Sequence, residues 1–198
     1  MKKYVLTNNI STIGNTILYQ IKALRSFAGI NEGDLGGWIQ SENNLSHKGD
    51  AWVSGNAWVY GNAKVYGNAK VSGSAWVYGD AEVSGDAEVS DNAEISGDAT
   101  VSGNAKVSGN ATVSGNAWVL GNAKVLGDAK VLGDGWVLSN AKVSGNATVS
   151  GNAEISGDAT VSGNAWVSGS AWVYGNAKVS GNAAVSGDAE VSGSAVRR

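Results

Sequence analysis

The sequence predicts an all-β chain that winds into a solenoid of short parallel strands, and three observations predict it. From Ala51 to Ala195 the chain repeats every six residues without an insertion, with alanine first in each unit, except for Gly135, and valine or isoleucine third. These two apolar positions lie two residues apart, which is the spacing of side chains on one face of a strand. Most units end in glycine followed by asparagine or aspartate, a pair that turns the chain at little conformational cost.

The length of the repeat predicts how the strands stack. A six-residue strand cannot bury its apolar face alone, so neighbouring units must cover one another. With three sides and about 18 residues per coil, Ala51–Ala195 would form about eight coils in a triangular prism roughly 40 Å long. A flatter solenoid, in which each coil has two sides and therefore two repeat units, stays an alternative.

The repeat resembles that of the left-handed β-helix superfamily of hexapeptide-repeat proteins. In those proteins an aliphatic residue is followed four positions later by a small one, as Val107 is followed by Ala111 here. The resemblance implies a left-handed parallel β-helix. Parallel crossovers are right-handed in nearly all other folds, so the expected hand rests on the resemblance and not on general principles.

The segment before the repeat adds a narrower resemblance. Residues 27–39 read FAGINEGDLGGWI, and the motifs NLS at 44–46, Gly49-Asp50 and Trp52 follow. This leader resembles the start of uncharacterised YdcK-like proteins and of related hexapeptide-repeat proteins that bacteriophages and prophages often encode. The resemblance implies a phage or prophage association. Such relatives are commonly labelled acyltransferases from their fold, although a fold does not determine an activity.

Residues 1–36 are expected to form a small β-rich N-terminal cap, and residues 37–198 the solenoid. The apolar patterns of residues 3–7 and 17–23 predict two strands, and Gly14-Asn15 predicts a two-residue hairpin turn between Ile13 and Thr16. Extending the six-residue phase backwards places Ile39 and Leu45 on the alanine position. The same phase places His47 on the valine position, facing inward in the first coil.

Composition limits the classes of function. The chain has no cysteine, so disulfides and thiolate metal sites are excluded. Its net charge is −3, and acidic residues outnumber basic ones in the solenoid, so we expect no nucleic-acid partner. We also expect no membrane partner and a cytoplasmic location, because no long apolar run or signal peptide is present. Turn aspartates such as Asp80 and Asp98 lack the clustered oxygen ligands of a calcium site, so we expect no metal and no cofactor.

The sequence offers one candidate catalytic base. Acyltransferases of the hexapeptide-repeat superfamily use a histidine base, a loop extruded between coils, and a trimer whose prisms enclose acyl-CoA. The only histidine here is His47, and the repeat contains no loop. We therefore expect His47 to be a cap residue and the protein to be no enzyme, with an acyl-CoA-dependent acyltransferase as the alternative.

The outward positions of the repeat are the candidate binding residues, because there the residue type is free. In a three-sided coil, large apolar residues fall side by side in adjacent coils and form two quartets: Trp58, Tyr60, Trp76 and Tyr78, and Trp118, Leu120, Trp136 and Leu138. A quartet of this size is expected to approach the few hundred Å² of apolar surface that usually marks an interaction site. Cross-strand stacking that only stiffens the sheet is the competing interpretation.

Other outward residues extend this pattern. Leu126 and Leu132 continue the second quartet around the prism, and Trp166, Trp172 and Tyr174 add a third aromatic region. A row of stacked lysines is also expected, formed by Lys106, Lys124 and Lys142. We interpret this row as a solvated face.

These observations favour a non-catalytic structural or binding solenoid that displays aromatic patches to a protein partner or to another copy of itself. A homo-oligomer is possible in either of two forms, a trimer or an end-to-end assembly. An end-to-end self-assembling scaffold is a further alternative, because residues 195–198 end the chain without a capping helix or loop.

Overall fold

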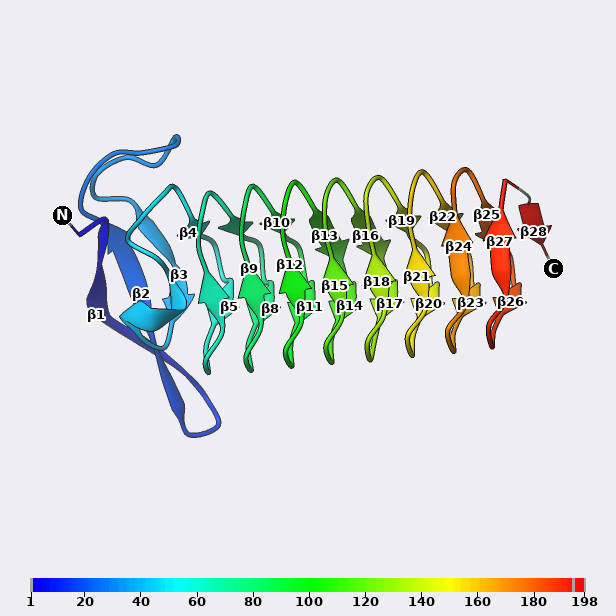
Figure 1. Ribbon diagram of the computed structural model, residues 1–198. Coiled ribbons are helices and arrows are strands. Elements are labelled where there is room, and N and C mark those ends of the chain that lie inside the picture. Colours follow the sequence, from blue (N-terminus) through cyan, green and yellow to red (C-terminus); the bar gives the residue numbers. More distant parts are fainter. Residues whose placement is uncertain (1, 194, 198) are drawn as a thin grey trace.

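The computed structural model describes residues 2–193 and 195–197, and it is an all-β solenoid of about nine turns with an antiparallel cap at its N-terminal end (Figure 1). The cap lies at one end of the row of coils and the last strand at the other. Three parallel sheets run along the prism, which confirms the three-sided coil. Arg198, part of the predicted C-terminal end, lies outside the described residues.

The eleven-stranded sheet joins the cap to the solenoid, since β3 pairs antiparallel with β2 and parallel with β5. Its strands, in spatial order, are β1 (Tyr4–Ile13), β2 (Thr16–Ala23), β3 (Leu35–Ile39), β5 (Trp58–Val59), β8 (Trp76–Val77), β11 (Glu94–Ile95), β14 (Thr112–Val113), β17 (Lys130–Val131), β20 (Thr148–Val149), β23 (Trp166–Val167) and β26 (Ala184–Val185).

The other two sheets belong to the solenoid alone. The nine-stranded sheet contains β4 (Trp52–Val53), β7 (Lys70–Val71), β10 (Glu88–Val89), β13 (Lys106–Gly109), β16 (Lys124–Gly127), β19 (Lys142–Val143), β22 (Thr160–Val161), β25 (Lys178–Ser180) and β28 (Ala195–Arg197). The eight-stranded sheet contains β6 (Lys64–Val65), β9 (Glu82–Val83), β12 (Thr100–Val101), β15 (Trp118–Val119), β18 (Trp136–Val137), β21 (Glu154–Ile155), β24 (Trp172–Tyr174) and β27 (Glu190–Ser192). One 3₁₀-helix, η1 (Glu42–Asn44), lies in the first coil.

The core is the stack of alanine and valine side chains inside the prism. From Ala51 to Ala183 every repeat alanine has an exposed fraction of 0%, and so do nearly all the repeat valines and isoleucines. Each side chain meets its equivalent in the next coil, as Val89 pairs with Val107 and Val107 with Val125. The inward assignment of the two apolar positions is therefore confirmed.

The cap hairpin follows the predicted pattern. Strands β1 and β2 pair antiparallel, and the pair Ile13 and Thr16 closes the turn at Gly14-Asn15. Strand β1 is longer than predicted because a register shift between Leu6 and Ile10 accommodates extra residues. Within the described residues, no helix is long and apolar enough to cross a membrane.

The predicted phase of the first coil is wrong. The regular repeat would place Ile39 and Leu45 opposite alanines, but Ile39 pairs with Val59 and Leu45 with Val65, so both occupy valine positions. The regular spacing begins at Gly49, whose backbone lies against Gly67. Two extra residues between Leu45 and Gly49 cause the difference, and they displace His47 from the interior.

Side chains of the cap and of η1 satisfy the backbone of the first coils, where no preceding coil supplies donors. The Lys3 ammonium donates to the carbonyl of Ala51 at 2.6 Å, and the Asn44 amide donates to the carbonyl of Ala63 at 2.9 Å. The Tyr4 hydroxyl donates to the carbonyl of Leu45 at 2.7 Å. Lys3, Tyr4 and Asn44 are all buried, so the cap and η1 close this end of the prism with polar side chains as well as apolar ones.

A one-residue adjustment occurs at the last strand. Val179 pairs with Val196, although the regular repeat would place Arg197 opposite Val179. The shift keeps valine against valine at this end, so hydrophobic pairing determines the register of β28.

Candidate functional site

Outward side chains form columns along the prism because each coil lies in register with the next. The residue after each alanine and the residue after each valine point away from the core. Adjacent parallel strands lie about 4.8 Å apart, so equivalent side chains in successive coils are in contact distance. A column of aromatic residues therefore becomes a stack on one face.

The first predicted quartet forms such a stack on the eleven-stranded sheet. The rings of Trp58 and Trp76 are parallel within 4° with centroids 5.4 Å apart, and those of Tyr60 and Tyr78 are parallel within 4° at 5.1 Å. The Tyr78 hydroxyl donates to the carboxylate of Glu94 in the next coil. This hydrogen bond raises the pKa of Tyr78, and burial raises the pKa of Tyr60.

The sequence did not reveal that Trp38 belongs to the same column. Trp38 pairs with Trp58, so three tryptophans follow one another at the cap end of this sheet. The two extra residues in the first coil hide this relation, because a search at the regular spacing of the repeat finds Gln40 instead.

The second predicted quartet lies on the eight-stranded sheet. Trp118 and Trp136 stack within 7° of parallel with centroids 5.3 Å apart, and their exposed fractions are 42% and 40%. Leu120 and Leu138 are half-buried beside them, on the same outward side of β15 and β18. The structure thus brings together all four residues of each quartet, on different faces of the prism.

The third aromatic region is divided between two faces. Trp172 and Tyr174 meet edge to face on the eight-stranded sheet, with ring centroids 6.0 Å apart. Trp166 lies on the eleven-stranded sheet, where its indole N–H donates to the Ser150 hydroxyl at 3.1 Å.

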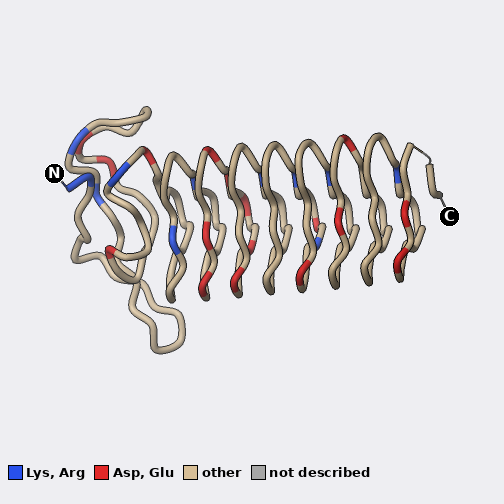
Figure 2. Tube along the Cα trace, in the orientation of Figure 1, with Lys and Arg blue, Asp and Glu red and all other residues tan. Residues whose placement is uncertain are grey.

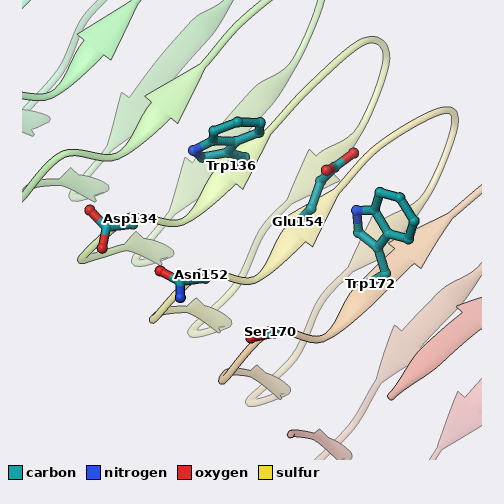
Figure 3. Close-up of a pocket in the computed structure, with 6 residues that line it drawn as sticks. All are labelled: Asp134, Trp136, Asn152, Glu154, Ser170 and Trp172. Atoms are coloured by element: carbon teal, nitrogen blue, oxygen red, sulfur yellow. The ribbon is translucent and has the colours of Figure 1, made fainter. Parts of the chain in front are cut away.

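A groove that sequence reasoning missed lies between the second quartet and Trp172 (Figure 3). Its volume is about 380 Å³, and its lining residues come from three successive coils: Asp134, Trp136, Asn152, Glu154, Ser170 and Trp172. Figure 3 shows the Glu154 side chain between the two indoles, with Asp134, Asn152 and Ser170 along the adjoining turns. The sequence feature that could have revealed this groove is the column of Trp118, Trp136, Glu154 and Trp172, which follow one another at intervals of one coil.

The structure places the His47 side chain against the cap, beside Lys3 and Tyr4. Its ring stacks on Tyr4 with centroids 4.3 Å apart, and its Nδ1 accepts from the backbone N–H of Lys3 at 3.2 Å. Its Nε2 lies 3.5 Å from a carboxylate oxygen of Glu42. The expected inward position in the first coil is wrong, since the side chain is half-buried outside the core.

Charged side chains are also arranged in columns. The basic residues Lys106, Lys124 and Lys142 follow one another on the nine-stranded sheet, as expected from the sequence, and Figure 2 shows a row of basic positions along the solenoid. Lys106 forms an ion pair with Glu88 at 2.7 Å in the preceding coil. All three lysines are exposed, and exposed pairs of this kind contribute little stability.

The turn aspartates and asparagines form ladders between coils. The Asn62 amide donates to Asp80 at 2.8 Å, and the Asn116 amide donates to Asp134 at 2.7 Å. Throughout residues 2–193 and 195–197, no group of three or more histidine, aspartate or glutamate side chains could hold a metal ion. Asp80 and Asp134 each accept a hydrogen bond from an asparagine of the preceding coil.

Comparison with known proteins identifies the repeat. The family described as the YdcK β-solenoid repeat matches residues 63–79, 105–121, 141–154 and 153–169. Most of these segments are about one coil long, and each lies in the solenoid and not in the leader. The chain is therefore similar to YdcK-type β-solenoid proteins over these repeats. No curated protein matches the chain.

Proposed function

We propose that this protein is a non-catalytic binding solenoid that displays outward aromatic patches to a protein surface, another copy of this chain included. The observation that supports this most directly is the Trp118 and Trp136 stack, in which both indoles are about two-fifths exposed on a face without loops. The proposal also includes the phage or prophage association implied by the leader and the expected cytoplasmic location.

The geometry of the patch favours binding over mere stiffening of the sheet. Fully exposed tryptophans present about 150 to 250 Å² each, so two indoles and two leucines leave on the order of 200 to 300 Å² of apolar surface. The stacked indoles are already ordered by their neighbours, so little side-chain entropy is lost on binding. Rigid aromatic residues of this kind are enriched in the energetic centres of protein interfaces.

The position of His47 supports a non-catalytic role. Its ring is held against the cap by Tyr4 and by the backbone of Lys3. An acyltransferase would require an acceptor site at this end, and the repeat that follows has no extruded loop to build one.

The test is a double substitution, Trp118→Lys with Trp136→Lys. Both side chains lie outside the core, so the fold should stay intact while oligomerisation or partner binding is lost through like charges in the patch. Light scattering at equal protein concentration measures the mass, and circular dichroism checks the fold. The matched control is Trp166→Lys, on another face and outside a tryptophan stack.

The interpretation depends on whether the wild type is an oligomer or a monomer in solution. A wild-type dimer or trimer that dissociates in the double variant and persists in Trp166→Lys supports the proposal. For a monomeric wild type, the same variants are compared in cross-linking of purified phage or host partners. Association that is unchanged in the double variant, including end-to-end stacking, would contradict a role for the patch.

A further inference from the structure

The column of Trp118, Trp136, Glu154 and Trp172 contains a gap in an otherwise aromatic stack. These residues occupy equivalent outward positions in four successive coils of the eight-stranded sheet. Trp118 and Trp136 touch face to face, but the next coil places a carboxylate where a third indole would continue the stack. The groove between Trp136 and Trp172 is the space that remains, and Figure 3 shows Glu154 at its centre.

The dimensions of the gap suit a compact organic cation. Trp136 and Trp172 stand two coils apart, which is roughly 10 Å from strand spacing alone. The Glu154 side chain lies between them, so a cation above its carboxylate would lie about 5 Å from each indole, within the range in which an aromatic face attracts a cation. The two walls are available, since Trp136 and Trp172 are 40% and 46% exposed.

The charge of the groove also favours a cation. Most other glutamates on the solenoid columns have partners: Glu88 pairs with Lys106, Glu82 with Lys64, and Glu94 accepts from Tyr78. Among the described residues, Glu154 has no ion pair, and the only lysine in its outward column is Lys64, five coils away. Asp134 adds a second carboxylate to the groove. An acidic groove with two aromatic walls has the polarity that a cation requires.

We propose that the groove formed by Trp136, Glu154 and Trp172 binds a quaternary ammonium group. Such a cation is weakly hydrated compared with a primary ammonium, so it loses less on entering an aromatic site and needs no directed hydrogen bonds. The Glu154 carboxylate supplies the counter-charge, and the indoles supply the walls. A trimethylated lysine of a protein and a choline headgroup of a lipid share this chemistry.

A second aromatic and acidic groove in the same chain provides an internal control. On the eleven-stranded sheet Trp76 is followed by Glu94, and these residues line a groove with Ser74 and Asn92. Thr112 follows Glu94 in this column, so the second aromatic wall is absent. The Glu94 carboxylate also accepts a hydrogen bond from the Tyr78 hydroxyl. This groove should not bind the cation.

The test uses choline as the probe and its uncharged isostere 3,3-dimethylbutanol as the reference, with calorimetry and with the indole N–H resonances of the eight tryptophans. Choline should bind saturably and shift the Trp136 and Trp172 resonances. Glu154→Gln should weaken binding about tenfold, as expected for loss of a close counter-charge, and Trp172→Ala by a similar factor. Glu94→Gln should leave binding unchanged, and melting curves confirm that each variant is folded.

Three results would overturn the proposal: no saturable binding, equal affinity for the uncharged isostere, or shifts of the same resonances by oligosaccharides in place of choline. Phosphatidylcholine vesicles and a trimethyl-lysine peptide distinguish the two sources. The ligand that the groove recognises should bind the wild type and bind Glu154→Gln more weakly, as choline does. The groove shares Trp136 with the proposed association patch of Trp118 and Trp136, but Glu154 and Trp172 belong to the groove alone. Glu154→Gln and Trp172→Ala should leave the molecular mass unchanged, so the two proposals fail independently.

Discussion

Asp91 and Ser139 occupy turn positions that glycine holds in almost every other unit. Both have positive φ values of 61°, a conformation that disfavours residues with a β-carbon. Asp91 recovers part of this cost, because its carboxylate accepts from the backbone N–H of Gly109 at 3.0 Å. No such bond is found for Ser139 among the described residues, so its turn should be the more strained.

Ser139→Gly should therefore stabilise the protein by about 1 kcal/mol, because glycine adopts this conformation without strain. The opposite change, Gly97→Ala, should destabilise it, since the new β-carbon would lie 2.9 Å from the carbonyl oxygen of Gly115 at a φ of +68°. Thermal unfolding of the two variants checks the sign of each effect. A lower melting temperature for Ser139→Gly would show that the serine side chain has a stabilising contact.

His47→Ala tests the role of the only histidine. We expect the wild type to transfer no acetyl group from acetyl-CoA to amino-sugar acceptors, and the variant to differ only in stability. The loss of the Tyr4 stack and of the acceptor for the Lys3 N–H should cost about 1 to 2 kcal/mol. Acetyl transfer by the wild type that disappears in His47→Ala would contradict the non-catalytic assignment.

At the scale of elements, the cap contains a buried lysine. Lys3 is fully buried, and its ammonium donates to carbonyls at the start of the solenoid and lies 5.2 Å from the Phe27 ring centroid. Burial lowers the pKa of Lys3 to about 8, with Asp50 opposing the shift and Arg25 adding to it. Burial also raises the pKa of the neighbouring Tyr4 hydroxyl.

These shifts predict how stability changes with pH. An unfolded lysine keeps its proton up to about pH 10.4, so between pH 8 and that value the unfolded chain binds more protons than the folded chain. Stability should therefore rise with pH from about 8, by at most about 3 kcal/mol. Above about pH 10 Tyr4 acts in the opposite sense, because only the unfolded chain loses the tyrosine proton.

Urea unfolding between about pH 7 and pH 10 measures the effect, and Lys3→Met is the control that removes the titrating group. The wild type should gain stability over this interval relative to Lys3→Met. Parallel pH profiles of the two proteins would show that the Lys3 ammonium is not destabilised by burial.

The repeat and the cap hairpin could be predicted from the sequence because local rules determine them. Alanine and valine two residues apart determine which side chains face inward, and Gly14-Asn15 determines where the hairpin turns. The phase of the first coil could not be predicted, since residues 46–48 contain no signal that two of them bulge out of the repeat. The groove at Glu154 was missed because its lining residues come from three coils and include a charged residue between two tryptophans.

At the scale of the whole molecule, the six-residue repeat separates folding from function. The inward positions hold almost only alanine, valine and isoleucine, whereas the outward positions vary among tryptophan, lysine, glutamate, threonine and serine. Each coil contacts only its neighbours, so stability accumulates along the prism and an outward substitution should not affect it far away. The two aromatic quartets lie on different sheets, so a substitution in one quartet should leave the other unchanged.

The comparison of Val107→Asp with Lys124→Asp tests this separation most directly. Val107 is fully buried in the middle of the prism, so the first variant places an unpaired charge in the core and should cost more than about 4 kcal/mol. Lys124 is exposed in the next coil of the same sheet, between Lys106 and Lys142, so the second variant should melt like the wild type or slightly higher. The measurement is thermal unfolding by circular dichroism. A large fall in melting temperature for Val107→Asp alone is the predicted result, and wild-type melting of Val107→Asp would contradict the account.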